Sequence, residues 1–346
     1  MLGILIVENQ SRLKTRNRTS YVCVFFSMLA GLMLWGWTSA QTTAPDPPKP
    51  GVSTPAVRRA MADIHPRATF VVAGSPDWMA VTDDAVWVTS ASADHVVRLD
   101  ANTNKRTTIV TIKKPCSGLA AGFGSIWSPS CGSHNLARID DRTGKIQSEI
   151  AVGPADSEGG ITLGAGSIWM ASDKKGVLAR IDPITNKVSA EIEIPSGSFG
   201  VAFGDGAVWI TSTDHNLLTR VDPQSNKVVA SISVGPQPRF LAVGGGSVWT
   251  LNQGDGTISR VEEQGNKLVA NIPAGIPGPG GEIAYGEGSV WATAIQIPIT
   301  RIDPATNAVV QQWFGTGGDS IRVGHGSVWL TDLFHGKVWR LDPKQR

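Results

Sequence analysis

Six charged side chains stand where an otherwise repetitive sequence departs from its own pattern: Asp77, Glu158, Arg239, Glu282, Asp319 and Arg322. Glu158 and Glu282 each adjoin a pair of glycines, which allow the backbone to approach a ligand closely. The four carboxylates, gathered round one axis, could coordinate a divalent cation, Mg²⁺ or Ca²⁺, through their oxygens. The same charges could instead form a solvated rim in which acids and bases neutralise one another. Both interpretations stay open at the level of the sequence.

Two sets of metal ligands can be drawn from the sequence. Glu158 and Glu282 are the first candidates for a divalent cation, and Asn252 and Asp332, which follow apolar strands, could join them. Four histidines at corresponding turns are candidates for a zinc site: His95, His134, His215 and His335. These turns are expected at the periphery of the fold and apart from one another, so the histidines are the weaker set.

The elements that must position these side chains come from a repeat of 38 to 42 residues. Each copy centres on a tryptophan in a segment that follows the form G-x-G-S-V-W: Trp87, Trp127, Trp169, Trp209, Trp249, Trp291 and Trp329. An arginine follows each tryptophan after ten or eleven residues: Arg98, Arg138, Arg180, Arg220, Arg260, Arg301 and Arg340. An acid follows each arginine by two positions: Asp100, Asp140, Asp182, Asp222, Glu262, Asp303 and Asp342. Seven uninterrupted copies of one module predict a repeat architecture.

Each module contains four predicted strands, A to D, with A innermost. In the fifth module they cover residues 240–243, 247–251, 257–262 and 267–272. Val208 and Ile210 flank Trp209, so strand B is apolar on both faces, as packing between two neighbouring sheets requires. The turn after strand C carries Asn or Gly at one recurring position, because a tight hairpin needs a residue with positive φ. The sequence therefore predicts an all-β fold, a seven-bladed β-propeller of four-stranded blades.

The two ends of the repeat predict how the ring closes. The seventh module stops at Arg346, before a strand D, whereas residues 68–74 resemble a strand D and precede the first complete module. We expect this N-terminal strand to complete the C-terminal blade, which removes an open sheet edge. The predicted domains are a signal peptide (1–40), a Pro-rich linker with one short helical turn near Arg58 (41–66) and the propeller (67–346).

Two further motifs are interpreted as structural. Each repeated arginine has an acid two residues on, hence on the same strand face, and we expect local ion pairs between them. The recurring G-x-G elements lie in the A–B hairpins and open no helix, so they do not predict phosphate loops.

The N-terminal segment has the composition of an export signal. Basic residues precede an apolar run at residues 21–37, and the small residues Thr38, Ser39 and Ala40 follow it. Its removal leaves 27 basic and 28 acidic residues, a net charge of −1, which argues against a nucleic-acid partner. We expect a periplasmic or secreted monomer that contacts the membrane only if the segment is not cleaved.

The cysteines give a second indication of export. Cleavage would remove Cys23 and leave Cys116 and Cys131. These two lie symmetrically about a hairpin centred between Phe123 and Gly124, so antiparallel strands would place them opposite one another. An even pair of cysteines in an exported domain predicts a disulfide.

The repeat also resembles a known family. Residues 208–235 begin V-W-I-T and end R-V-D-P-Q-S-N-K-V-V-A-S-I-S-V-G, which resembles the YncE-like propellers with YVTN-type repeats. The pattern, over residues 68–343, is also similar to the streptogramin (virginiamycin B) lyases. That resemblance implies a magnesium-assisted elimination that uses mouth histidines and glutamates. Here the strand-A entrance positions carry no histidine, whereas Glu158 and Glu282 match the glutamates. The YncE-like relatives imply extracytoplasmic binding.

Two functions remain in competition. The first is a non-catalytic envelope propeller that binds a small molecule or an envelope protein at the channel mouth. The alternative is a metal-assisted lyase or a lactonase at the same mouth, motivated by the acids Asp77, Glu158, Glu282 and Asp319. In that alternative a divalent ion would polarise a carbonyl group and one carboxylate would move the proton.

Overall fold

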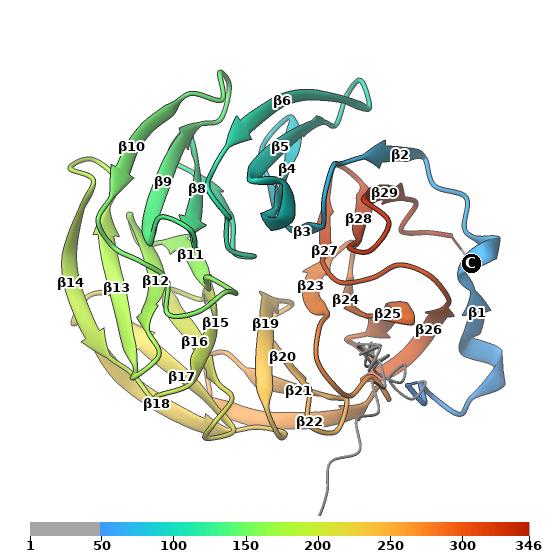
Figure 1. Cartoon of the computed structure of the whole chain (residues 1–346). Coiled ribbons are helices and arrows are strands. Elements are labelled where there is room, and N and C mark those ends of the chain that lie inside the picture. The colour runs from blue at the N-terminus through green and yellow to red at the C-terminus, as the bar shows by residue number, and fades with distance from the viewer. Residues whose placement is uncertain (1–48, 346) are drawn as a thin grey trace, which may run out of the picture. The chain divides into compact units, whose positions relative to one another are not determined.

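The computed structural model describes residues 49–345, which form seven β-sheets arranged in a ring (Figure 1). The predicted signal peptide (1–40) and the first part of the predicted linker (41–48) lie outside the described residues. In the part of the chain that is described, no helix is long and apolar enough to cross a membrane. The predicted fold class, a seven-bladed propeller, is confirmed.

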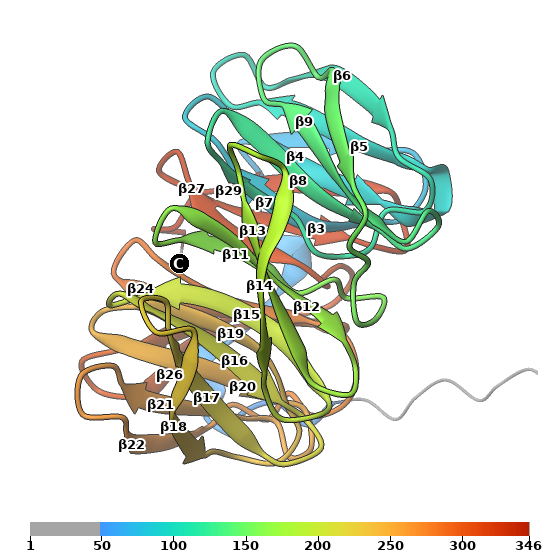
Figure 2. The same cartoon turned by 90° about the vertical axis from the view of Figure 1, so that its left-hand side faces the viewer.

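Each blade runs from an innermost strand outward, and its strands pair antiparallel (Figure 2). Blade one contains β3 (Pro76–Val81), β4 (Ala85–Ser90), β5 (His95–Asp100) and β6 (Lys105–Thr111), with the 3-10 turn η3 (Ala91–Ala93) between β4 and β5. Blade two contains β7 (Ala120–Gly122), β8 (Ser125–Ser130), β9 (Asn135–Asp140) and β10 (Ile146–Ile150). Blade three contains β11 (Ile161–Gly164), β12 (Ser167–Asp173), β13 (Val177–Asp182) and β14 (Lys187–Glu193). Blade four contains β15 (Ser198–Gly204), β16 (Ala207–Ser212), β17 (Leu217–Asp222) and β18 (Lys227–Ser233).

The remaining blades follow the same order. Blade five contains β19 (Pro238–Gly244), β20 (Ser247–Asn252), β21 (Thr257–Glu262) and β22 (Lys267–Pro273). Blade six contains β23 (Glu282–Gly286), β24 (Ser289–Ala294), β25 (Ile297–Asp303) and β26 (Ala308–Phe314). Blade seven contains β27 (Ile321–Gly324), β28 (Ser327–Asp332) and β29 (Lys337–Leu341).

The ring closes as the sequence predicts. Strand β2 (Ala68–Val71) pairs antiparallel with β29, from Ala68 opposite Arg340 to Val71 opposite Lys337, and is the outermost strand of blade seven. Figure 1 shows the N-terminal strand β2 beside the C-terminal strand β29. The contact between the two ends of the repeat leaves no open blade at the junction.

The described part of the predicted linker is bound to the propeller. After the 3-10 turn η1 (Pro55–Val57), strand β1 (Arg58–Ala60) pairs parallel with β26 and makes blade six five-stranded. A second turn, η2 (Met61–Asp63), follows it, and Met61 and Ile64 pack against the core between blades six and seven. The Pro-rich composition predicts an extended segment, but it does not reveal this edge pairing.

The repeated tryptophans form the core between blades, with side chains from 0% to 4% exposed. In six blades the indole Nε1 donates to the carbonyl oxygen of the glycine that begins the A–B turn. Blade one has Thr82 in place of that glycine, and the buried Trp87 Nε1 has no hydrogen-bond partner in the described residues. The G-x-G elements therefore form the A–B turns, and their first glycine accepts the indole N–H. Each is followed by a strand and not by a helix.

The prediction of local arginine–acid ion pairs is wrong in six of the seven blades. Among the described residues only Arg98 pairs with the acid two positions on, at 3.4 Å from Asp100. In five of the other blades this acid instead accepts backbone N–H groups of the turn that follows its strand, as Asp140 does from Arg142 and Thr143. Backbone hydrogen bonds lower the pKa of Asp140 below its ordinary value. The turn amides satisfy these acids, which leaves the arginines free to reach elsewhere.

The arginines connect neighbouring blades. Arg180 lies over the ring of Trp169 in its own blade and donates to Pro223 O and Asn226 Oδ1 in the C–D turn of the next. The equivalent asparagines have φ of 52° to 54°, and Gly144 has φ of 70°, as the turn prediction requires. Six of the seven arginines donate to the next blade's turn in this way. We call each such contact an inter-blade clamp; Arg98 is the exception among the seven, because its bonds to Asp84, Asp100 and Thr107 all stay within its own blade.

Candidate functional site

The structure brings all six charged residues to one end of the central channel, which we call the D–A mouth because every strand A begins there. Asp77 lies in β3, Arg239 in β19, Glu282 at the start of β23 and Arg322 in β27. Glu158 and Asp319 lie in the loops that precede β11 and β27. They form three connected groups: a carboxyl pair and two acid–arginine pairs.

Asp77 and Asp319 form the carboxyl pair. The two carboxyl groups lie close enough to act on each other's pKa, and Ser117 Oγ donates to Asp77 Oδ2 at 2.8 Å. Burial, followed by repulsion from Asp319, raises the pKa of Asp77 well above its ordinary value. Burial also raises the pKa of Asp319 to about 6. Two acids that act on each other's pKa titrate as one coupled unit.

Glu282 forms the most enclosed acid–arginine pair, because only 2% of its side chain is exposed. Its carboxylate accepts from Ser320 Oγ and from Ile321 N and pairs with Arg322. Burial raises the pKa of Glu282 to about 7, although the Arg322 charge acts in the opposite direction. The guanidinium of Arg322 lies 4.7 Å from the ring centre of Trp78.

The second acid–arginine pair joins Glu158 Oε1 to Arg239 Nη2 at 2.6 Å. The same guanidinium group lies 3.9 Å from Asp156 Oδ2 and 4.3 Å from the ring centre of Phe199. Asp156 Oδ1 accepts from the backbone N–H groups of Glu158 and Gly159, which fixes the turn that carries Glu158. Burial and the nearby Glu158 raise the pKa of Asp156 above its ordinary value.

Two aromatic rings lie beside these charges. Trp78 of blade one and Phe240 of blade five contact each other with ring centres 5.6 Å apart. Beyond them, toward the A–B turns, a cavity of about 340 Å³ is lined by strand-A residues of all seven blades, with Trp78 and Arg322 in its wall. The D–A mouth is therefore a charged site bordered by aromatic rings.

The proposed metal ligands are not gathered in one place. Asn252 donates to Thr257 and Ser259 within blade five, and Asp332 accepts from His335 Nδ1 at 2.8 Å. Glu282 is occupied by Ser320, Ile321 and Arg322. Between residues 49 and 345 there is no group of three or more His, Cys, Asp or Glu side chains arranged to hold an ion. The donor set does not fit a resident divalent cation, and the histidine set does not fit zinc.

The site residues predicted from the sequence are all charged. The prediction missed the uncharged residues that occupy the same positions in other copies of the repeat. The residues ten positions before the repeated tryptophans are Asp77, Ser117, Gly159, Phe199, Arg239, Gly281 and Asp319. The residues nine positions before them are Trp78, Gly118, Gly160, Gly200, Phe240, Glu282 and Ser320. Reading all seven members of each position would have found the residues that contact the charged groups. Asp156 lies outside both positions, and its spacing of two from Glu158 is its only signal.

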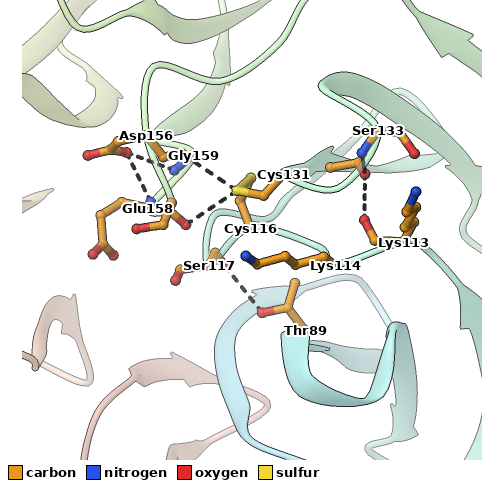
Figure 3. Close-up of a disulfide and its surroundings, with 12 residues drawn as sticks. Thr89, Lys113, Lys114, Cys116, Ser117, Cys131, Ser133, Asp156, Glu158 and Gly159 are labelled. Atoms are coloured by element: carbon orange, nitrogen blue, oxygen red, sulfur yellow. Dashed lines mark hydrogen bonds between the residues drawn. A yellow bond between two sulfur atoms is a disulfide. The ribbon is translucent and has the colours of Figure 1, made fainter.

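The predicted disulfide is confirmed. Cys116 and Cys131 are bonded, with Cα atoms 5.2 Å apart (Figure 3). The hairpin pairing on which the prediction depends holds from Gly122 opposite Ser125 to Ala120 opposite Trp127. It then shifts by two residues, because the next paired residues are Pro115 and Ser130. The prediction found the correct pair, although the ladder is interrupted between the hairpin and the cysteines.

Comparison with known proteins gives a fold. No family model matches the sequence, and no curated protein matches it. A streptogramin B lyase structure superposes with a TM-score of 0.67 at 20% identity, over 79% of this chain and 96% of that one. The virginiamycin B lyase of Staphylococcus aureus gives a TM-score of 0.66 at 20% identity, over 79% and 98% of the two chains. Kuenenia stuttgartiensis hydrazine synthase gives 0.66 at 15% identity, over 78% and 96%. The likeness to the streptogramin lyases is confirmed for the propeller fold, while the YncE-like resemblance stays a prediction.

Proposed function

We propose that this chain is an exported, non-catalytic propeller that binds a small molecule carrying a protonated amino group at the D–A mouth. The observation that carries the proposal is the Asp77–Asp319 carboxyl pair. Among the described residues neither carboxyl group has an ion-pair partner, whereas Glu158 and Glu282 each have an arginine. The mouth therefore holds one acidic group that is not neutralised from within the protein.

The electrostatics of the pair favour a cation. Two partly buried carboxyl groups that repel each other resist ionising together, and we infer that the empty pair retains a proton at neutral pH. A ligand ammonium group would take the place of that proton, and the released charge would be balanced by the ligand. Binding should therefore release protons and strengthen as the pH rises through the titration of the pair.

The surroundings suit the remainder of such a ligand. The half-buried ring of Trp78, backed by the buried ring of Phe240, lies beside the charged groups and offers apolar contact to a hydrocarbon chain. Each of the two acid–arginine pairs is neutral, so the carboxyl pair makes the net charge of the mouth negative. A negative mouth attracts a cation from solution. The location is part of the proposal: the Cys116–Cys131 disulfide supports an oxidising compartment such as the periplasm or the cell exterior.

A panel of matched probes tests this function. We expect n-butylammonium to bind, and the isosteric neutral alcohol and the carboxylate butyrate not to bind, in calorimetric titrations. A pH-stat should record proton release on binding of the ammonium probe. Asp319→Asn should weaken binding about tenfold or more, about 1.4 kcal/mol, whereas Asp83→Asn, an exposed residue at the opposite A–B turn, should not. Equal binding of the three probes, or binding indifferent to Asp319→Asn, would contradict the proposal.

The second candidate function is a lyase or a lactonase at the same mouth. The observation that favours it is the pKa of Glu282, about 7, together with that of Asp319, about 6. Groups that gain and lose a proton near neutral pH suit general acid–base catalysis, and the fold is shared with streptogramin lyases. The predicted divalent ion lacks a grouped donor set here, and we derive no step through it. Metal analysis separates the two candidates: a stoichiometric ion that is lost in Glu158→Gln and Glu282→Gln would favour the enzyme.

A further inference from the structure

We propose that the Cys116–Cys131 disulfide is a redox-sensitive control of the D–A mouth: it fastens the loop that presents Ser117 to Asp77 and that holds the Glu158 turn in place. This inference rests on the proposed function, because it concerns the regulation of the same site.

The disulfide stands where blade two lacks a strand ladder. Strand β7 has three residues and is the shortest innermost strand of the ring, whereas β15 and β19 have seven each. Its ladder ends at Ala120 opposite Trp127, and pairing resumes only at Pro115 opposite Ser130. Between these pairs Cys116 N donates to Pro129 O at 2.9 Å, whereas residues 117–119 have no ladder to hold them against β8. The covalent bond adds to the Cys116–Pro129 hydrogen bond and so fastens the start of this unpaired loop.

The fastened loop supplies the hydroxyl group of the carboxyl pair. Ser117 follows the bonded cysteine directly, and its Oγ donates to Asp77 Oδ2 at 2.8 Å. Its carbonyl oxygen accepts from Thr89 Oγ1 at 3.3 Å (Figure 3), which orients the loop toward blade one. The position of Ser117 on the Asp77–Asp319 pair is therefore set one residue away from the sulfur bridge.

The same loop holds the neighbouring turn of blade three. Ser117 N donates to Ser157 O at 2.9 Å, and Gly118 N donates to Glu158 O. Cys131 Sγ lies 3.8 Å from Asp156 O (Figure 3). A Cβ atom on Gly118 would lie 1.9 Å from Gly159 O, so the two turns pack without room for a side chain. Loosening of the loop would therefore disturb the Glu158–Arg239 pair as well as the Asp77–Asp319 pair.

Opening of the bridge needs a dithiol reductant, either a small molecule or a dithiol oxidoreductase. Cys116 is 2% exposed and Cys131 is half-buried, so a reductant thiolate reaches Cys131 Sγ first. That attack forms a mixed disulfide and expels Cys116 as a thiolate, which takes up a proton. The second thiol of the reductant then closes its own disulfide and releases Cys131. Two electrons pass to the protein, and the reductant is oxidised by two.

Hydrogen exchange tests the structural half of the proposal without any ligand. In the oxidised protein the amides of Ser117 and Gly118 should be protected by their bonds to Ser157 and Glu158. After treatment with dithiothreitol, peptides that cover 113–119 and 154–160 should exchange about tenfold faster or more, while a peptide that covers β19 should not change. Unchanged exchange in reduced protein, with both thiols alkylated to prove reduction, would overturn the proposal.

Binding tests the functional half. The affinity of n-butylammonium should fall about tenfold on reduction, and Cys116→Ser/Cys131→Ser should bind as weakly as reduced protein and ignore dithiothreitol. Ser117→Ala, which keeps the bridge, should lower the affinity by a smaller factor. If the double variant does not fold, reduced wild-type protein and Ser117→Ala still decide the question. No binding to oxidised protein would reject the amine function alone, and the exchange result would still judge the redox control. Equal affinity in both redox states would overturn the control.

Discussion

The inter-blade clamps and the D–A mouth use the same residue types in opposite ways. In a clamp, a charged arginine stacks on a tryptophan of its own blade and donates to neutral oxygen atoms of the next blade. At the mouth, arginines also lie over aromatic rings, but they pair with carboxylates, one buried (Glu282) and one partly buried (Glu158). Because the clamp recurs from blade to blade, each clamped arginine finds its hydrogen-bond acceptors in the turn of the next blade. The mouth is assembled from residues that no other blade repeats, and it retains a carboxyl pair with no counterion in the described chain. The clamped arginines thus find their partners within the repeat, and the carboxyl pair without a counterion is the candidate site.

The largest expected effect is the loss of stability on removal of a repeated core tryptophan. Trp209→Ala should lower the free energy of unfolding by about 3–5 kcal/mol, because the ring is fully buried between blades and stacks under Arg220. The mouth tryptophan provides the matched test. Trp78→Ala, whose ring is only half-buried, should reduce stability much less and weaken n-butylammonium binding. Urea unfolding measures the free energy of unfolding of both variants. Equal losses would contradict the distinction between the core tryptophan and the mouth tryptophan.

The next largest effect is expected at the disulfide, which lies in a repeated blade and also borders the D–A mouth. A bridge that spans 15 residues should contribute about 3 kcal/mol through the entropy of the unfolded chain. Cys116→Ser/Cys131→Ser should therefore unfold at lower urea concentration than oxidised wild-type protein. Reduced wild-type protein is the control, since it should match the double variant. If oxidised protein and the double variant unfold together, the bridge has no structural role.

The carboxyl pair should destabilise the fold at neutral pH. The pKa of Asp319 is raised in the folded state to about 6, so the folded protein holds a proton that the unfolded chain releases between about pH 4 and 6. The proton on Asp319 stabilises the folded state fully below the pKa of the unfolded chain. This stabilisation is lost as the pH rises through the pKa of the folded state. Asp319→Asn should therefore gain on the order of 1–2 kcal/mol over wild type at pH 7.5, after allowance for partial exposure, and little at pH 4. A variant that loses stability at pH 7.5 would show that the pair is structural.

The sequence predicted the repeated half of the molecule far better than the mouth. Periodic tryptophans, turn asparagines and the strand at 68–74 determine the ring, because each is a local pattern that recurs or completes a recurrence. The direction of the arginines could not be read from spacing. An acid two residues away on the same strand is near in sequence, but the next blade's turn is nearer to the extended guanidinium. Asn252 and Asp332 were placed at the mouth by position alone, and their own blades satisfy them. Which side chains meet across the channel, as Trp78 and Phe240 do, depends on the curvature of the closed ring.

The smallest effect tests why the turn position carries asparagine. A positive φ alone is satisfied by glycine, as at Gly144, whereas the clamp also needs the Oδ1 that Arg180 contacts at 2.9 Å in Asn226. Asn226→Gly should therefore cost about 0.5–1 kcal/mol, since the lost hydrogen bond outweighs the relief of backbone strain. Asn226→Asp keeps an acceptor and should cost less. Gly144→Asn should bring no gain, because Arg98 is held in its own blade by Asp84 and Asp100, and a Cβ atom on Gly144 would lie 2.5 Å from Thr108 Cγ2. Urea unfolding of the three variants would settle the matter: a stabilised Gly144→Asn would mean that Arg98 can leave its own acids and that blade one can be clamped like the others.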